Sequence, residues 1–131
     1  MLDALARALA DDSRIAYALV FGSSARGSAG AGSDLDVAVG LAAGARLTTL
    51  ELGELTTRLE GATGRPVDLV LLDDAPPALA YRVFRDGRPI VQRDPGAMVE
   101  RKARAILEYL DFQPIEELCA RGALDAAVHG R

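Results

Sequence analysis

The sequence has few of the features that would place it outside the cell or in a membrane. Its 131 residues include a single cysteine, Cys119, which by itself forms neither an internal disulfide nor a zinc site. No apolar run reaches the roughly 18 to 20 residues that span a bilayer. The first residues lack a basic segment followed by a hydrophobic one. We therefore expect a cytoplasmic protein that does not enter a membrane.

Positive charge and aromatic side chains are also scarce. The chain has 15 Lys and Arg against 19 Asp and Glu, a formal net charge of −4. Broad nucleic-acid binding depends on an excess of basic residues, so we expect no such binding. A local phosphate-binding site is still compatible with this charge. Aromatic residues are 5% of a chain that is 50% hydrophobic. Leu, Val, Ile and Ala must therefore build the core.

The hydrophobic pattern predicts alternating helices and strands in a single domain, residues 1–131. Expected helices cover residues 3–12, 46–60, 78–85 and 96 onward, and expected strands cover residues 15–21, 34–39, 67–72 and 88–92. Pro114 is expected to end the long last helix before a weaker one, so that helices fill about residues 96–128. The order predicts an α/β or α+β fold, with a core over about residues 15–94 and one mixed β-sheet flanked by helices.

Two carboxylates on one predicted strand are candidates for metal binding. Asp34 and Asp36 share one face of the strand with Ala38, and Leu35, Val37 and Val39 share the other. This alternation predicts a half-buried strand with an acidic edge. Oxygen ligands placed side by side are what Mg²⁺ accepts. The alternative is a solvated strand edge.

A glycine-rich segment precedes this acidic strand. Gly22 and Ser23 directly follow the first predicted strand, and residues 22–33 contain four glycines and four serines. A Gly-Ser turn presents backbone N–H groups and a hydroxyl to an anion, and the missing side chain lets phosphate oxygens come close. Asp68, on the third predicted strand, is expected on the same face of the sheet and can complete a cluster of three carboxylates. Alternatively, Asp68 is a polar strand boundary after Pro66.

These residues resemble the signature of the DNA polymerase β-like nucleotidyltransferase superfamily. The likeness lies in Val20–Gly27 and Ser33–Val39, and the small members of the superfamily, the minimal nucleotidyltransferases, are also similar in residues 66–70 and 77–91. The resemblance covers about residues 15–94. A common form of the motif has arginine where Ser24 stands.

The resemblance implies a polymerase β-like fold and a role for each motif residue. Gly22 and Ser23 would contact the triphosphate of ATP, Asp34 and Asp36 would hold two Mg²⁺ ions, and Asp68 would bind the catalytic metal and accept the proton of the attacking hydroxyl. Arg26 would neutralise phosphate charge, or is a solvated loop residue. Two-metal chemistry of this kind needs no histidine.

The resemblance also implies a partner. Minimal nucleotidyltransferases of this size are commonly antitoxins paired with a HEPN-domain RNase toxin, which suggests AMP transfer from ATP to a toxin tyrosine in a type VII-like pair. Larger nucleotidyltransferases add a domain that binds the acceptor, and we expect a protein partner to serve instead. Seven residues separate Arg121 from His129 and no tyrosine follows, so the chain does not resemble the RNase. The alternatives are an antitoxin that acts by binding alone and a homodimeric enzyme that modifies a hydroxylated antibiotic.

Two apolar stripes are expected on predicted helices. Leu52, Leu55 and Leu59 are predicted to pack in the core. The second stripe is either core or a partner surface, and its members are Val99, Ala103, Ile106 and Leu110.

Overall fold

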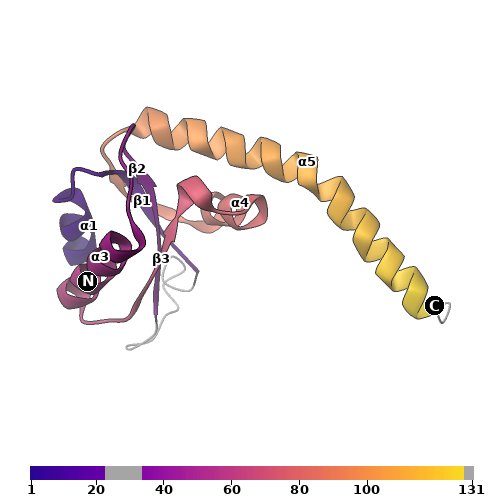
Figure 1. The fold of residues 1–131 in the computed structure, drawn as a ribbon, viewed down its shortest axis with the longest axis horizontal. Coiled ribbons are helices and arrows are strands. Elements are labelled where there is room, and N and C mark those ends of the chain that lie inside the picture. The colour runs from indigo at the N-terminus through magenta and orange to yellow at the C-terminus, as the bar shows by residue number, and fades with distance from the viewer. Residues whose placement is uncertain (23–33, 129–131) are drawn as a thin grey trace.

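The computed structural model describes residues 1–22 and 34–128, with side chains through residue 111. The elements follow the predicted order, as Figure 1 shows. The helices are α1 (Leu2–Ala10), α3 (Thr49–Thr63), α4 (Pro77–Asp86) and α5 (Pro95–Val128), with a short 3₁₀ turn, η1, at Leu72–Asp74. The strands are β1 (Ile15–Phe21), β2 (Leu35–Leu41), β3 (Val67–Leu71) and β4 (Arg88–Gln92).

The described strands form one mixed sheet in the order β3-β2-β1-β4. β1 lies between β2 and β4 and is antiparallel to both, whereas β2 and β3 are parallel. A parallel pair needs a crossover connection, and α3 supplies it. The predicted mixed sheet flanked by helices is therefore confirmed.

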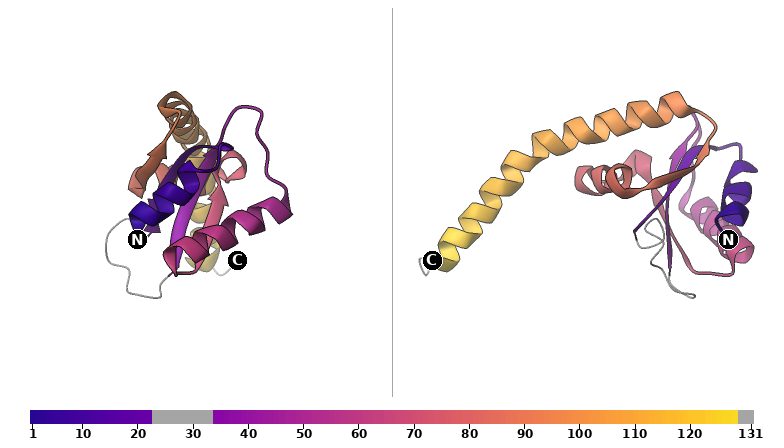
Figure 2. Two further views of the ribbon diagram at one scale, coloured as in Figure 1. Left: turned by 90° about the vertical axis from the view of Figure 1, so that its left-hand side faces the viewer. Right: turned by 180° about the vertical axis from the view of Figure 1, so that it is seen from behind.

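Helices cover both faces of this sheet, as the two views of Figure 2 show. α1 and α3 pack on one face, where their buried leucines meet alternate residues of β1 and β2. α4 and the first part of α5 pack on the other face through Ala80, Val83, Phe84 and Ala105. Ala38 is fully buried on this second face. The expected half-buried β2 is therefore wrong in its central part, because α4 and α5 cover the face that the alternation left to solvent.

The crossover helix α3 has well-defined ends that also fix the start of β3. The Thr48 hydroxyl accepts a hydrogen bond from the Glu51 N–H at 3.1 Å, and the Glu51 carboxylate accepts one from the Thr48 N–H at 3.0 Å. Gly64 ends the helix with a φ of 69°. The Val67 N–H then donates to the Glu60 carboxylate at 2.9 Å. The helix thereby holds the first residue of β3 in place.

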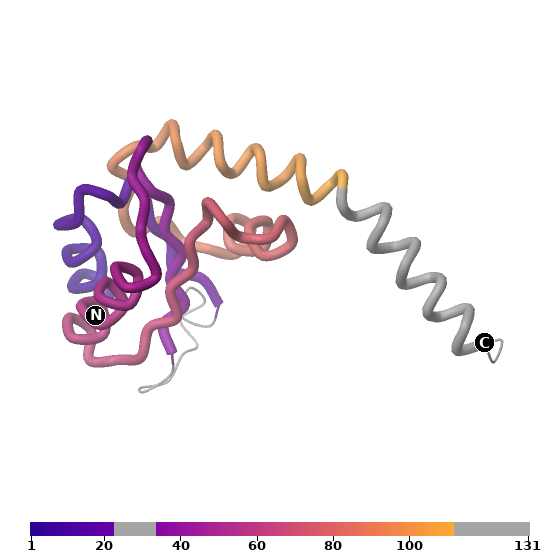
Figure 3. The backbone as a smooth tube through the Cα atoms, in the orientation of Figure 1, coloured from indigo at the N-terminus to yellow at the C-terminus, as the bar shows by residue number. Residues whose placement is uncertain are grey.

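The last helix is continuous, which corrects one prediction. α5 runs from Pro95 to Val128 and includes Pro114, where the sequence predicted a break. A proline inside a helix removes one backbone hydrogen bond and can bend the helix without ending it. The first half of α5 runs past α4, as the coloured part of the tube in Figure 3 shows. The helix then extends away from the domain (Figure 1). In the part of the chain that the structure describes, no helix is both long and apolar enough to cross a membrane.

The two faces of the first part of α5 differ in burial. Arg101 and Ala105 are buried against the domain, and the Arg101 guanidinium donates twice to the Leu72 carbonyl, at 2.9 and 3.1 Å. Residues on the opposite face are exposed: Val99 by 62% and Leu110 by 54%. The second apolar stripe is therefore not part of the core of this chain.

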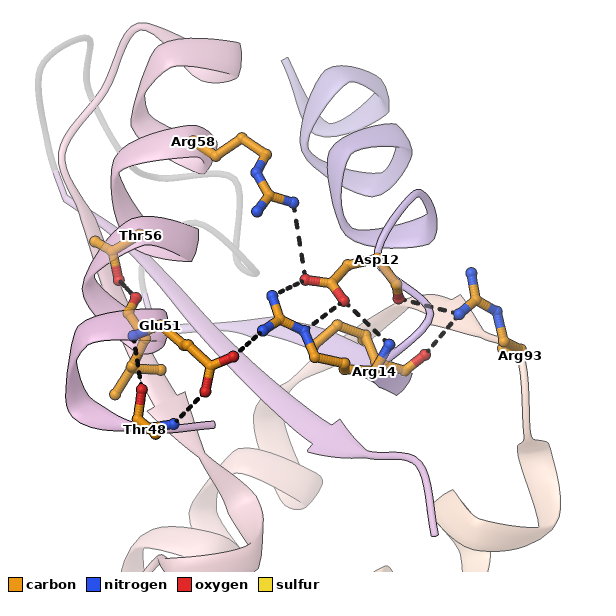
Figure 4. A network of polar contacts seen from close by, with 9 residues as sticks. Asp12, Arg14, Thr48, Glu51, Thr56, Arg58 and Arg93 are labelled. Atoms are coloured by element: carbon orange, nitrogen blue, oxygen red, sulfur yellow. Dashed lines mark hydrogen bonds and ion pairs between the residues drawn. The ribbon is translucent and has the colours of Figure 1, made fainter. Parts of the chain in front are cut away.

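A polar network joins α1, β1 and α3 at one end of the sheet (Figure 4). Asp12 is buried, and its two carboxylate oxygens accept hydrogen bonds from the Arg14 guanidinium at 2.7 and 2.9 Å. Arg14 also reaches Glu51 at 2.9 Å. These contacts lower the pKa of Asp12, with the hydrogen bonds from Arg14 as the largest cause. The Asp12 carbonyl accepts a further hydrogen bond from Arg93.

Candidate functional site

Strand pairing brings two of the predicted site residues together. Asp36 is the register partner of Asp68 across the parallel pair β2 and β3. Register partners on adjacent strands point to the same face of a sheet and lie about 5 Å apart at their backbones. Asp34 directly precedes β2 and is exposed, as is Asp68, whereas Asp36 is half-buried. The three acids that the sequence predicted as a cluster thus lie at one end of two neighbouring strands.

Gly22 lies against this pair at the end of β1. Its neighbour Phe21 is the register partner of Asp36 across β1 and β2. Gly22 has a φ of +66°, and a Cβ atom placed on it would come 2.3 Å from a carboxylate oxygen of Asp36. Both the backbone conformation and the missing side chain therefore require glycine here. The turn that the sequence predicted for phosphate binding begins in contact with the acids.

Two of the predicted phosphate-binding residues cannot be placed. Ser23 and Arg26 lie outside the described residues, as does Ser24. Their expected contacts with a nucleotide stay predictions.

The electrostatics of the site disfavour negative charge. Burial raises the pKa of Asp36, and the nearby charges of Asp68 and Asp34 raise it further. Within residues 1–22 and 34–111, none of these three carboxylates forms a hydrogen bond or an ion pair. Unpaired carboxylates that repel one another have no use in packing, and a bound cation would relieve the repulsion.

The donor chemistry of the cluster fits a divalent cation that is shared with a substrate. Among the described side chains, no three acidic, histidine or cysteine groups are arranged to hold a metal ion by themselves. Mg²⁺ is usually held by one or two carboxylates together with waters and substrate phosphates, and not by a cage made only of protein ligands. Asp36 and Asp68, with Asp34 beside them, are the residues that would hold it.

A cavity of about 420 Å³ opens over the paired acids. Its walls come from the ends of β1, β2 and β3 and from one face of α4, and they are Phe21, Gly22, Asp36, Asp68, Val70, Leu79, Arg82 and Asp86. The contribution of α4 to this cavity was not predicted from the sequence. The available signal was the spacing of Leu79, Arg82 and Asp86, which puts them on one face of the helix.

Comparison with known families identifies this arrangement. The model of the family described as "Polymerase beta, Nucleotidyltransferase" matches residues 3–96. The chain belongs to this nucleotidyltransferase family. The family match covers the whole sheet, α1, α3 and α4, and therefore every wall of the cavity. A comparison with curated proteins finds no match.

Solved structures share the nucleotidyltransferase fold. A chain from a toxin-antitoxin structure with AMP-PNP is 22% identical, with a TM-score of 0.81 over 94% of this chain and 98% of that one. A chain from the complex of a tri-AMPylated Shewanella oneidensis HEPN toxin with its MNT antitoxin is 21% identical, with a TM-score of 0.74 over 95% and 99%. A third structure, proposed to be a minimal nucleotidyltransferase, is 36% identical, with a TM-score of 0.54 over 67% and 87%. The resemblance to minimal nucleotidyltransferases seen in the sequence is thereby confirmed.

Proposed function

We propose that this chain is the antitoxin of a type VII-like pair and transfers AMP from ATP to a tyrosine hydroxyl of a HEPN-domain toxin. The observation that carries the proposal is the pairing of Asp36 with Asp68 beside Gly22 in a nucleotidyltransferase fold. The similar structures support it, because one holds AMP-PNP and another holds an AMPylated HEPN toxin.

The residues of the chain divide the work of the proposed reaction. Gly22 and Ser23 hold the triphosphate, with Arg26 as a further contact. Asp34, Asp36 and Asp68 hold two Mg²⁺ ions, which when bound neutralise the phosphates and stabilise an in-line displacement. Asp36 is half-buried, and the apolar side chains of Phe21 and Val70 line the cavity with it.

The chemical step is a displacement at the α-phosphorus of ATP. The tyrosine oxygen forms a bond to this phosphorus, the bond to the bridging oxygen of the β-phosphate breaks, and pyrophosphate leaves with the electron pair. Asp68 accepts the proton of the tyrosine hydroxyl. Because Asp68 is exposed, it can return this proton to solvent after the product leaves.

The test of this proposal is the mass of the acceptor. The chain is co-expressed with the proteins encoded beside it, and the intact mass of any HEPN-domain protein among them is measured. We expect one or more added AMP groups with the native chain and none with the double variant Asp34→Asn, Asp36→Asn. The matched control is Asp3→Asn, Asp11→Asn, which removes one exposed charge in α1 and one directly after it and should leave the modification intact.

Stability measurements separate lost chemistry from lost structure. Since burial and repulsion disfavour the charge of Asp36, the double Asn variant should unfold at a temperature no lower than the native chain. An unmodified partner in a tight complex with the native chain would contradict transfer and indicate an antitoxin that acts by binding alone. Modification of a hydroxylated antibiotic in place of the partner would indicate a small-molecule enzyme.

A further inference from the structure

One helix contributes a positive charge to the cavity over the paired acids. Leu79, Arg82 and Asp86 lie on one face of α4 and line this cavity together with Asp36 and Asp68. Among the cavity residues that the structure describes, Arg82 alone is basic. The cavity therefore places one guanidinium together with three carboxylates, those of Asp36, Asp68 and Asp86.

Arg82 is not used by the fold. It is exposed, and within the described part of the chain its guanidinium makes no hydrogen bond or ion pair. Arg85, one turn further along the same helix, differs in this respect. It donates to the Asp86 carboxylate at 2.9 and 3.0 Å and lies 5.9 Å from the centre of the Tyr81 ring. Arg85 is held by its own helix, and Arg82 is free to contact a ligand.

We infer that Arg82 binds the polyphosphate of the nucleotide and the pyrophosphate that leaves. This inference rests on the proposed function, since it assigns a residue to the same site. A guanidinium matches phosphate oxygens with two parallel hydrogen bonds, which are stronger than neutral ones. Phe21, Val70 and Leu79 are apolar and offer no competing partner. The Asp86 carboxylate already accepts two hydrogen bonds from Arg85.

The movement of charge during the reaction explains why a cation is useful on the α4 side of the cavity. Breaking the bond to the β-phosphate moves negative charge onto the departing pyrophosphate. Asp36 and Asp68 are acids and cannot donate a hydrogen bond to that charge when ionised, so a cationic side chain from another element would add to the stabilisation that bound Mg²⁺ supplies. α4 lies across the cavity from β2 and β3 and supplies Arg82.

The test measures ligand binding directly, in the presence of Mg²⁺. Dissociation constants for ATP and for inorganic pyrophosphate are measured by calorimetry, and that for adenosine by ligand-observed NMR. Arg82→Ala should raise the dissociation constants of ATP and pyrophosphate by about tenfold to a hundredfold, the range for loss of a charged hydrogen bond. The dissociation constant of adenosine should rise by less than about twofold. Arg82→Lys keeps the charge but not the planar guanidinium, so its dissociation constants for ATP and pyrophosphate should lie between those of the native chain and of Arg82→Ala.

Arg85→Ala is the matched control on the same helix. It removes an arginine that does not line the cavity itself but pairs with Asp86, so the ATP dissociation constant should change far less than in Arg82→Ala. Circular dichroism of each variant confirms the fold, and Arg82→Gln, which keeps the length of the stem, serves if the alanine variant is unstable.

The outcomes separate this inference from the proposed function. Failure of the native chain to bind ATP with Mg²⁺ would overturn the proposed function and with it the role of Arg82. Native binding that Arg82→Ala leaves unchanged would overturn only the role of Arg82. Equally weakened binding of ATP and adenosine in Arg82→Ala would also overturn the phosphate-binding role of Arg82, because Arg82 would then contact the nucleoside and not the phosphates.

Discussion

Gly22 and Asp36 constrain each other at the end of β1. Gly22 has a left-handed backbone conformation, and the absence of a side chain leaves room for the Asp36 carboxylate. A residue with a Cβ atom would push this carboxylate away from Asp68 or force the turn to shift. The pairing of the two acids therefore depends on a residue that carries no chemistry of its own.

Substitution of Gly22 by alanine separates this contact from backbone strain. Gly44 also has a positive φ, +79°, but a Cβ atom there would meet nothing within 4 Å. Gly44→Ala should thus lower the free energy of unfolding by about 1–2 kcal/mol, the cost of placing alanine in a left-handed conformation. Gly22→Ala should lose at least as much and should also weaken ATP binding, which Gly44→Ala leaves unchanged. Chemical denaturation and calorimetry measure the two effects, and equal ATP affinity of both variants would contradict the close contact.

The acids of the site were predictable at this scale, and Arg82 was not. Asp34, Asp36 and Asp68 could be found because each occupies a fixed place on a predicted strand, and strand alternation fixes the face. Arg82 is one of several arginines on or near α4, and the sequence does not say which helix face covers which end of the sheet. Only the packing of α4 on the sheet distinguishes Arg82 from Arg85.

At the scale of the elements, the network around Asp12 joins three of them. The Asp12 carboxylate receives the Arg14 guanidinium and backbone N–H, and Arg58 from α3 approaches it to 3.7 Å. The side chain of Asp12 is only 5% exposed, so its charge depends on these partners. The network holds α1 and α3 together on one face of the sheet.

Asp12→Asn should therefore destabilise the fold in a pH-dependent way. At about pH 7 the variant should lose about 2 kcal/mol in the free energy of unfolding, because a charged hydrogen-bond pair becomes a neutral one. The folded-state pKa of Asp12 lies below the ordinary value of 3.8, so its stabilisation is present above that value and is lost as the pH falls through the folded-state pKa. The difference between native chain and variant, measured by urea unfolding, should shrink below about pH 4.

The exposed neighbour Asp11 provides the control for this prediction. Asp11→Asn should change the free energy of unfolding by less than about 0.5 kcal/mol at any pH. A difference between Asp12→Asn and the native chain that stays constant down to about pH 2 would contradict an ionised Asp12 in the network.

The sequence predicted the elements well where local pattern decides them. The strand over residues 15–21 has the predicted bounds, because a short apolar run that ends at glycine leaves little choice. Tertiary packing decided the rest. Ala38 is buried because α4 covers it, and Leu52 is only half-buried although it belongs to the predicted leucine stripe, whereas Leu55 and Leu59 are buried as expected.

At the scale of the whole molecule, α5 is attached to the domain near its start. Arg101 connects it to the carbonyl of Leu72, which begins the turn after β3, and the stacked rings of Tyr81 and Tyr109 connect it to α4. The rings lie 4.0 Å apart and are nearly parallel. Beyond this part the helix extends away from the sheet (Figure 1).

Removal of Arg101 should loosen this attachment. Arg101→Ala removes two hydrogen bonds from the buried Leu72 carbonyl, leaves it the one from the Ala75 N–H at 3.3 Å, and opens a gap beneath α5, so it should cost about 2–3 kcal/mol in the free energy of unfolding. Arg104→Ala, which removes an exposed arginine paired with Glu108, should cost less than about 0.5 kcal/mol. Thermal unfolding measures both, and hydrogen exchange of the α5 amides should speed up only in the Arg101 variant.

The parallel pairing of β2 and β3 has a consequence for how sequences of this fold can diverge. Asp36 and Asp68 are aligned by strand register and not by the residues between them, which form a surface connection and α3. Insertions in the connection at residues 42–47 would leave the two acids opposite each other. A single-residue insertion inside β3 ahead of Asp68 would turn its side chain to the other face of the sheet. Length variation should thus be tolerated before α3 and excluded between Val67 and Asp68.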